Sequence, residues 1–105
     1  MTDNVQTPDL EKQGQATMTM VKTYPLGPGE WVSVYLVTPS TVKLQEFYVA
    51  TFKREGGPGI VYGIGISPRD AMHSALLEWD LIAGHDNNPF REVFIKYKVV
   101  CGGGE

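Results

Sequence analysis

Cysteine occurs once in this 105-residue chain, at Cys101, so no disulfide forms within one molecule and nothing points to an oxidising compartment. The two histidines, His73 and His85, match no metal-ligand spacing, so we predict neither a metal site nor a bound cofactor. No apolar run approaches the roughly 18 residues that cross a bilayer. The N-terminus lacks the charged start and apolar stretch of a secretory signal. We therefore expect a cytoplasmic protein without a membrane partner.

Positive charge is also scarce. Nine lysines and arginines stand against twelve aspartates and glutamates, which gives a net charge of −3 at neutral pH. A general nucleic-acid binder carries a strong positive excess, so this composition does not favour that class. The negative excess is too small to indicate a DNA mimic.

Large apolar residues are rare at the N-terminal end of the chain. Residues 1–17 contain no aromatic residue and only Val5 and Leu10 as large apolar ones, too few to offset the entropy of ordering the backbone. Residues 101–105 read Cys-Gly-Gly-Gly-Glu. We therefore expect a flexible N-terminal tail over 1–17, a single domain over 18–100 and a flexible C-terminal tail over 101–105.

Between these tails, alternating apolar and polar residues predict strands. The strongest candidates cover residues 30–38, 44–53, 60–66 and 91–100. The segment 18–24 is a weaker candidate for an edge strand. A glycine-rich turn at 55–59 predicts a hairpin, because glycine supplies the positive φ that tight reversals need.

Capping residues predict one helix over 68–83. Ser67 is a suitable N-cap, Pro68 follows at the first helical position, and Asp70 completes a capping box. Gly84 ends the helix. The apolar stripe expected to face the sheet consists of Ala71, Met72, Ala75, Leu76, Trp79, Ile82 and Ala83.

This order of elements predicts an α+β fold in the order β-β-β-α-β. We expect a three- to five-stranded, mainly antiparallel sheet with one helix packed on one face.

Few residues suggest catalysis. His85 and Asp86 resemble a base with its orienting carboxylate, but no nucleophile is placed to complete a triad, so a polar turn is the favoured interpretation. Residues 63–67 lead into a helix N-terminus, where phosphate can bind, but they complete no phosphate-binding motif. Close packing of the helix on the sheet is the favoured interpretation there. Cys101 is expected to be unreactive. We therefore assign no catalytic residue.

Two leucines need an explanation. Leu77 and Leu81 are four residues apart and lie nearly opposite the apolar stripe, with His73 nearby in the helical projection. A single exposed leucine is ordinary, whereas a pair indicates a contact with another surface. Leu77, Leu81 and His73 are therefore the candidate protein-binding residues.

Aromatic residues on the sheet raise an alternative. Trp31 and Tyr35 point away from the face that the helix covers, and aromatic side chains on an open sheet stack nucleobases. The candidate nucleic-acid-binding residues are Trp31, Tyr35, Tyr48, Lys96 and Lys98, the two lysines facing outward from the last expected strand.

The segment 47–52, a glycine-rich turn and the helix start at 63–71 resemble a module of small phage-type proteins of unassigned function and of HicB-like domains. These families run a strand pair into a G-x-S-P-x-x-A helix start, which is matched here by residues 65–71. The resemblance implies a phage or mobile-element setting and gives no residue a role.

The leading hypothesis is a small non-enzymatic interaction module that binds another protein, with a homodimer as one form of that partnership. The alternatives are a nucleic-acid-binding module that uses the aromatic sheet face and, least favoured, a small enzyme or ligand-binding domain.

Overall fold

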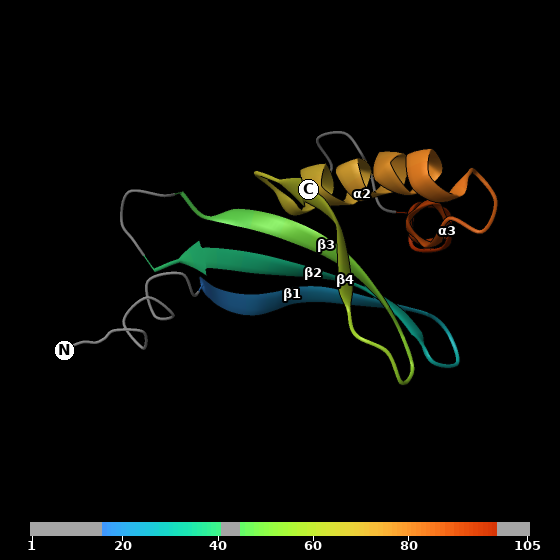
Figure 1. The fold of residues 1–105 in the computed structure, drawn as a ribbon, viewed down its shortest axis with the longest axis horizontal. Coiled ribbons are helices and arrows are strands. Elements are labelled where there is room, and N and C mark those ends of the chain that lie inside the picture. The colour runs from blue at the N-terminus through green and yellow to red at the C-terminus, as the bar shows by residue number, and fades with distance from the viewer. Residues whose placement is uncertain (1–15, 41–44, 99–105) are drawn as a thin grey trace.

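The computed structural model describes residues 16–40 and 45–98 (Figure 1). The predicted C-terminal tail and the predicted N-terminal tail, apart from Ala16 and Thr17, lie outside the described residues. The chain forms an α+β fold with an open antiparallel sheet of four strands in the order β1-β2-β3-β4. The elements are β1 (Ala16–Gly27), β2 (Glu30–Pro39), β3 (Phe47–Arg54), β4 (Ile60–Gly65), α2 (Pro68–Ala83) and α3 (Pro89–Lys96).

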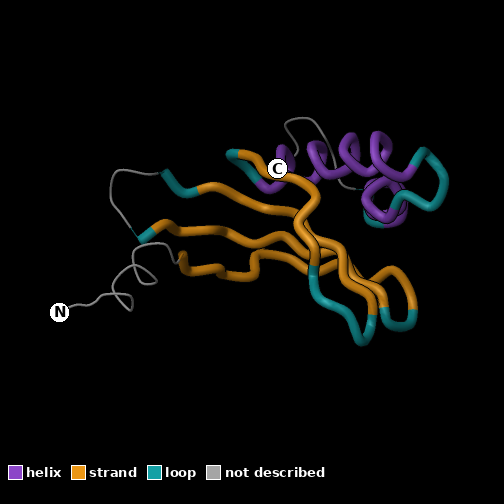
Figure 2. Tube along the Cα trace, viewed as in Figure 1, coloured by secondary structure: helices purple, strands orange, loops and turns teal. Residues whose placement is uncertain are grey.

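Both helices lie on the same side of the sheet (Figure 2), so the described residues place no helix on the other face, which we call the open face. The core lies between the helices and the sheet. It contains Val32 and Val34 from β2, Ala50 and Phe52 from β3, Ala71, Met72 and Ala75 from α2, and Phe90 and Val93 from α3.

The last described element is a helix, so the prediction of a strand over 91–100, of which residues 91–98 are described, and of a single helix is wrong. Asn88 is the N-cap of α3, with its side chain accepting bonds from the N–H groups of Phe90 and Arg91, and Pro89 occupies the first helical position. Four residues of this segment pack against the rest of the fold, and they fall at the helical spacing i, i+3, i+4 and i+7: Phe90, Val93, Phe94 and Tyr97. Phe90 and Val93 are fully buried. The alternation of polar and apolar residues over the same segment was the weaker signal.

The predicted edge strand at 18–24 is present and longer, because β1 covers Ala16–Gly27. Tyr97, which directly follows α3, contacts β1. The Tyr97 hydroxyl donates a 2.5 Å hydrogen bond to the carbonyl of Pro25, and the ring lies 5.1 Å from that of Tyr24. These contacts hold α3 over β1.

The predicted helix is confirmed as α2, including the Ser67 N-cap, whose hydroxyl accepts a 3.1 Å bond from the N–H of Asp70. Its buried face is shorter than predicted, because Ile82 is 60% exposed and Ala83 is also exposed. The prediction assumes that the sheet lies beneath the whole helix. In the structure the residues of α2 that pack on the core end at Trp79, so the last turn is exposed.

Two glycines bring α2 close to β4. A Cβ atom on Gly63 or Gly65 would lie closer than 3.0 Å to the backbone of Ala71, and one on Gly63 would also meet that of Ala75. The small residues at 63–67 therefore serve close packing, as the favoured interpretation of that segment predicts.

Candidate functional site

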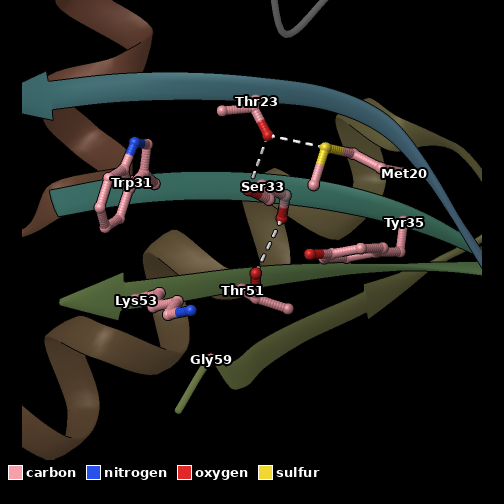
Figure 3. Close-up of a pocket in the computed structure, with 8 residues that line it drawn as sticks. All are labelled: Met20, Thr23, Trp31, Ser33, Tyr35, Thr51, Lys53 and Gly59. Carbon is pink, nitrogen blue, oxygen red and sulfur yellow. Dashed lines mark hydrogen bonds between the residues drawn. The ribbon is translucent and has the colours of Figure 1, made fainter. Parts of the chain in front are cut away.

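The face of the sheet opposite α2 and α3 carries the polar and aromatic side chains that line a groove. Directly opposite residues in an antiparallel sheet share a face. A groove of about 550 Å³ lies on this face (Figure 3). We call it the sheet groove, and its lining residues are Met20, Thr23, Trp31, Ser33, Tyr35, Thr51, Lys53 and Gly59.

The floor of the sheet groove is a row of three hydroxyl side chains on neighbouring strands. Thr23, Ser33 and Thr51 lie opposite one another in register across β1, β2 and β3. The hydroxyls of Thr23 and Ser33 share a 2.9 Å hydrogen bond, and the Thr51 hydroxyl donates a 3.3 Å bond to the Ser33 carbonyl. Thr23 Oγ1 also lies 3.0 Å from Met20 Sδ. These bonds hold the row in place, and Ser33 and Thr51 are only 7% and 6% exposed.

Two aromatic side chains flank this row. Trp31 and Tyr35 lie two residues to either side of Ser33 on β2, so all three share the open face. In Figure 3 the Tyr35 hydroxyl points toward the hydroxyl row from one side, and the Lys53 ammonium points toward it from the other.

Lys53 supplies the positive charge of the groove. It lies opposite Trp31 in the register between β2 and β3, and its side chain is exposed. Within the described part of the chain no carboxylate lines the groove or forms an ion pair with Lys53. As far as residues 16–40 and 45–98 define it, the groove therefore combines one cation without an ion-pair partner, a polar floor and two aromatic sides.

Only part of the aromatic set predicted from the sequence lies together. Trp31 and Tyr35 share the groove, whereas Tyr48 lies on the opposite face, packed against the core. Lys96 belongs to α3 and Lys98 follows it, on the helix-covered side of the sheet. The ammonium of Lys96 lies 5.5 Å from the centre of the Tyr97 ring.

Sequence reasoning missed Lys53, the hydroxyl row and Met20. The alternation within β2 and β3 placed each side chain on one of two faces. The register between β2 and β3 determines which side chains of β3 share a face with Trp31 and Tyr35. In the observed register Ser33 lies opposite Thr51 and Trp31 lies opposite Lys53, so Thr51 and Lys53 join the open face. The sequence offered no independent signal for that register.

A second surface lies on the outer side of α2. Leu77 is 50% exposed and Leu81 is 82% exposed, and His73 is exposed as well. We call these three residues the α2 outer face. Their position follows from the rotation of α2, which the Ser67 cap and the close contacts at Gly63 and Gly65 determine.

A polar cluster joins α2 to α3. The Asp80 carboxylate accepts hydrogen bonds from Asn88 Nδ2 at 2.9 Å and from an Arg91 guanidinium nitrogen at 2.6 Å, and His85 Nδ1 lies 3.2 Å away. The bond from Asn88 lowers the pKa of Asp80 most, and Arg91 and His85 lower it further, whereas partial burial raises it. Every group here has a structural partner, so the cluster holds the helices together.

The remaining candidates for chemistry do not converge. His85 contacts Asp80 and not its neighbour Asp86, and Cys101 lies outside the described residues. Among the residues that the structure describes, no three histidine, cysteine, aspartate or glutamate side chains are grouped to hold a metal ion. In the same part of the chain, no helix is both long and apolar enough to cross a membrane.

Comparison of the chain with protein-family models, with curated proteins and with solved structures finds no match. Function is therefore argued from the two surfaces themselves.

Proposed function

We propose that the protein is a small non-enzymatic interaction module that binds another protein through the α2 outer face. The observation that carries the proposal is the exposure of two large aliphatic side chains one helical turn apart, 50% at Leu77 and 82% at Leu81. Removing such a pair from water stabilises a complex by about 25 cal/mol per Å² of apolar surface.

These leucines stay outside because α2 has no freedom to rotate. Turning them inward would break the bond between Asp70 N–H and Ser67 Oγ. It would also drive larger side chains into the space where α2 meets Gly63 and Gly65. The fold therefore presents Leu77 and Leu81 outward whether or not a partner is bound.

The charges beside the leucines indicate which partner fits. Glu78 lies to one side of Leu77 and Leu81 in the helical projection, and Asp70 lies toward the start of the helix on the line between them. An apolar centre with acidic groups at its edge matches a partner with aliphatic or aromatic side chains surrounded by lysine or arginine. We propose a cytosolic setting for this pairing, and the resemblance to small phage-type proteins and HicB-like domains supports a phage or mobile-element origin.

The nucleic-acid alternative has less support. It retains Trp31 and Tyr35 on the open face, but Tyr48, Lys96 and Lys98 lie elsewhere, and Lys53 is the single lysine of the sheet groove. Affinity for a nucleic-acid strand comes largely from many cation–phosphate contacts. A strand would therefore gain stacking in the groove without the backbone contacts that hold it.

The double change Leu77→Ser and Leu81→Ser tests the proposal. We expect the variant to keep its melting temperature, because substitutions of exposed residues change stability by less than about 1 kcal/mol. We also expect it to lose a partner that the chain with both leucines captures by photo-crosslinking, with the photoreactive residue at position 74, beside the two leucines in the helical projection, in every chain compared. The matched control is Ile82→Ser, which alters a residue of the same helix that is 60% exposed and lies outside the α2 outer face.

The possible outcomes distinguish a separate protein partner, a second copy of the chain and no partner at the α2 outer face. Specific capture from position 74, with loss in the double variant and retention in the control, supports a separate protein partner. A wild-type dimer by light scattering that becomes a monomer in the double variant makes the partner a second copy. Unfolding of the double variant, or capture and assembly unchanged by it, overturns the proposal.

A further inference from the structure

We infer that the sheet groove binds a small planar nitrogen heterocycle that carries one anionic group. This site lies on the open face of the sheet, and α2 is on the other face, so the inference stands independently of the proposed protein partner. Its support comes from the size of the groove, its aromatic sides, its single cation and the state of its hydroxyl floor.

The groove has the dimensions of a small-molecule site. Its volume of about 550 Å³ falls within the range of ligand pockets. Trp31 and Tyr35 are four residues apart on β2, which separates their Cα atoms by about 13 Å in an extended strand. A ring system resting on one of these aromatic side chains therefore still reaches the floor between them.

Lys53 determines the charge of the ligand. Its ammonium points into the groove beside Trp31, and no described carboxylate neutralises it (Figure 3). A ligand that places an anionic group there gains an ion pair without breaking an existing one. Because Lys53 is the one cation among the described lining residues, the groove is complementary to one carboxylate or phosphate and not to a chain of phosphates.

The floor determines the polarity of the ring. The Thr51 hydroxyl donates its hydrogen to the Ser33 carbonyl, and the Thr23 hydroxyl donates its hydrogen to Met20 Sδ. The remaining hydroxyl hydrogen, that of Ser33, is then donated to Thr23 Oγ1. With these hydrogens used within the floor, the hydroxyl oxygens retain lone pairs that accept bonds. A ring with an N–H group on its edge satisfies those lone pairs, and a plain hydrocarbon ring does not.

Two probe molecules combine a ring N–H with one anionic group, and they represent two classes of ligand, nucleotides and aromatic acids. Uridine 5′-monophosphate has a ring N–H and a phosphate, and indole-3-acetate has a ring N–H and a carboxylate. Uridine and indole-3-acetamide are their neutral counterparts. Titration of the full chain, followed by ¹H–¹⁵N NMR, reports binding at the groove through the indole N–H signal of Trp31. The indole N–H of Trp79, which is buried in the core, is the internal control.

We expect at least one anionic probe to shift the Trp31 signal and leave the Trp79 signal in place. The neutral counterpart should bind about three- to five-fold more weakly, as expected for the loss of one exposed ion pair. Lys53→Gln should weaken binding of the anionic probe by the same factor. The matched control, Lys22→Gln, removes an exposed lysine from the opposite face of the sheet and should leave binding unchanged.

The titrations show which class of ligand the groove binds, and they also show whether the inference fails. Binding of uridine monophosphate alone assigns the groove to nucleotides, and binding of indole-3-acetate alone assigns it to aromatic acids. The inference is overturned if neither probe shifts Trp31 below about 10 mM, a limit that corresponds to negligible affinity. It is also overturned if neutral and anionic probes bind equally or if Lys53→Gln binds as the wild type does.

Discussion

Asn88 Nδ2 donates a 2.9 Å hydrogen bond to Asp80 Oδ1, and this bond connects the residue that caps α3 with the last turn of α2. The same nitrogen donates a second 2.9 Å bond to the Leu76 carbonyl, and Asn88 Oδ1 accepts from the N–H groups of Phe90 and Arg91. Asn88 is 2% exposed. One buried amide thus satisfies groups on both helices.

Removing this amide should loosen α3 from the domain. Asn88→Ala loses the N-cap and leaves the Leu76 carbonyl without its side-chain partner, so we expect the free energy of unfolding to fall by about 2–4 kcal/mol. Urea unfolding monitored by circular dichroism measures the change. The control is Asn87→Gly, because Asn87 is exposed and has φ 59°, a conformation that glycine adopts without strain. An Asn88→Ala variant as stable as this control would contradict a clamp between the helices.

The Asp80 carboxylate should make stability depend on acid. Asn88, Arg91 and His85 hold its folded-state pKa below the ordinary value of 3.8, so the stabilisation is fully present above pH 3.8. It is lost as the pH falls from there through the lower pKa of the folded state. Urea unfolding at a series of pH values should therefore show the wild type losing its advantage over Asp80→Asn across this window.

The control for acid stability is Asp86→Asn, which removes an exposed carboxylate from the loop between the helices and keeps the Asp80 contacts with His85 and Arg91. Its stability should follow that of the wild type as the pH falls. A constant difference between wild type and Asp80→Asn from neutral pH down to pH 2 would show that Asp80 acts through packing alone.

The sequence predicted α2 and the sheet because local chemistry and tertiary packing agree there. Ser67, Pro68 and Gly84 mark the helix ends, and the observed element begins and ends beside them. The failure at α3 has a physical cause: its residues both alternate and repeat at helical spacing. The pair Asn88–Pro89 was the deciding signal, since a capping side chain followed by proline starts a helix.

The sheet groove was less accessible to sequence reasoning. Alternation along β2 correctly placed Trp31 and Tyr35 on one face. Tyr48 lies on the other face because it shares the covered face of β3 with Ala50 and Phe52. Lys53 joins Trp31 only through the pairing of two strands, and pairing is a long-range property that no single strand encodes.

Trp79 should be the side chain whose loss costs most in the aromatic part of the core. Its ring centre lies 5.6 Å from that of Phe52, 5.0 Å from that of Tyr62 and 6.3 Å from that of Phe90. Trp79→Ala leaves a cavity between sheet and helices, so we expect a loss of about 3–5 kcal/mol. Chemical unfolding measures it, and a fully stable variant would mean that these ring contacts contribute little.

A subtler change at Trp79 separates packing from polarity. Among the described residues the buried Nε1–H of Trp79 has no hydrogen-bond partner. Trp79→Phe keeps a ring among Phe52, Tyr62 and Phe90 and removes this unpaired donor. A buried donor without a partner costs about 1–3 kcal/mol of stability. We therefore expect Trp79→Phe to be much more stable than Trp79→Ala in the same unfolding assay. Equal losses in the two variants would indicate that the indole makes a bond essential to the fold.

Gly63 should be irreplaceable because the backbone of α2 occupies the space of a side chain. A Cβ atom at this position would lie within 3.0 Å of backbone atoms of Ala71 and Ala75, which cannot move without lifting the helix. We expect Gly63→Ala to lower the melting temperature strongly and to expose Met72 and Trp79, raising tryptophan fluorescence quenching by iodide. Gly27→Ala is the matched control, since nothing lies within 4 Å of its added Cβ. If Gly63→Ala melts with this control, α2 does not approach the sheet as closely as the fold requires, and the fixed outward position of Leu77 and Leu81 loses its basis.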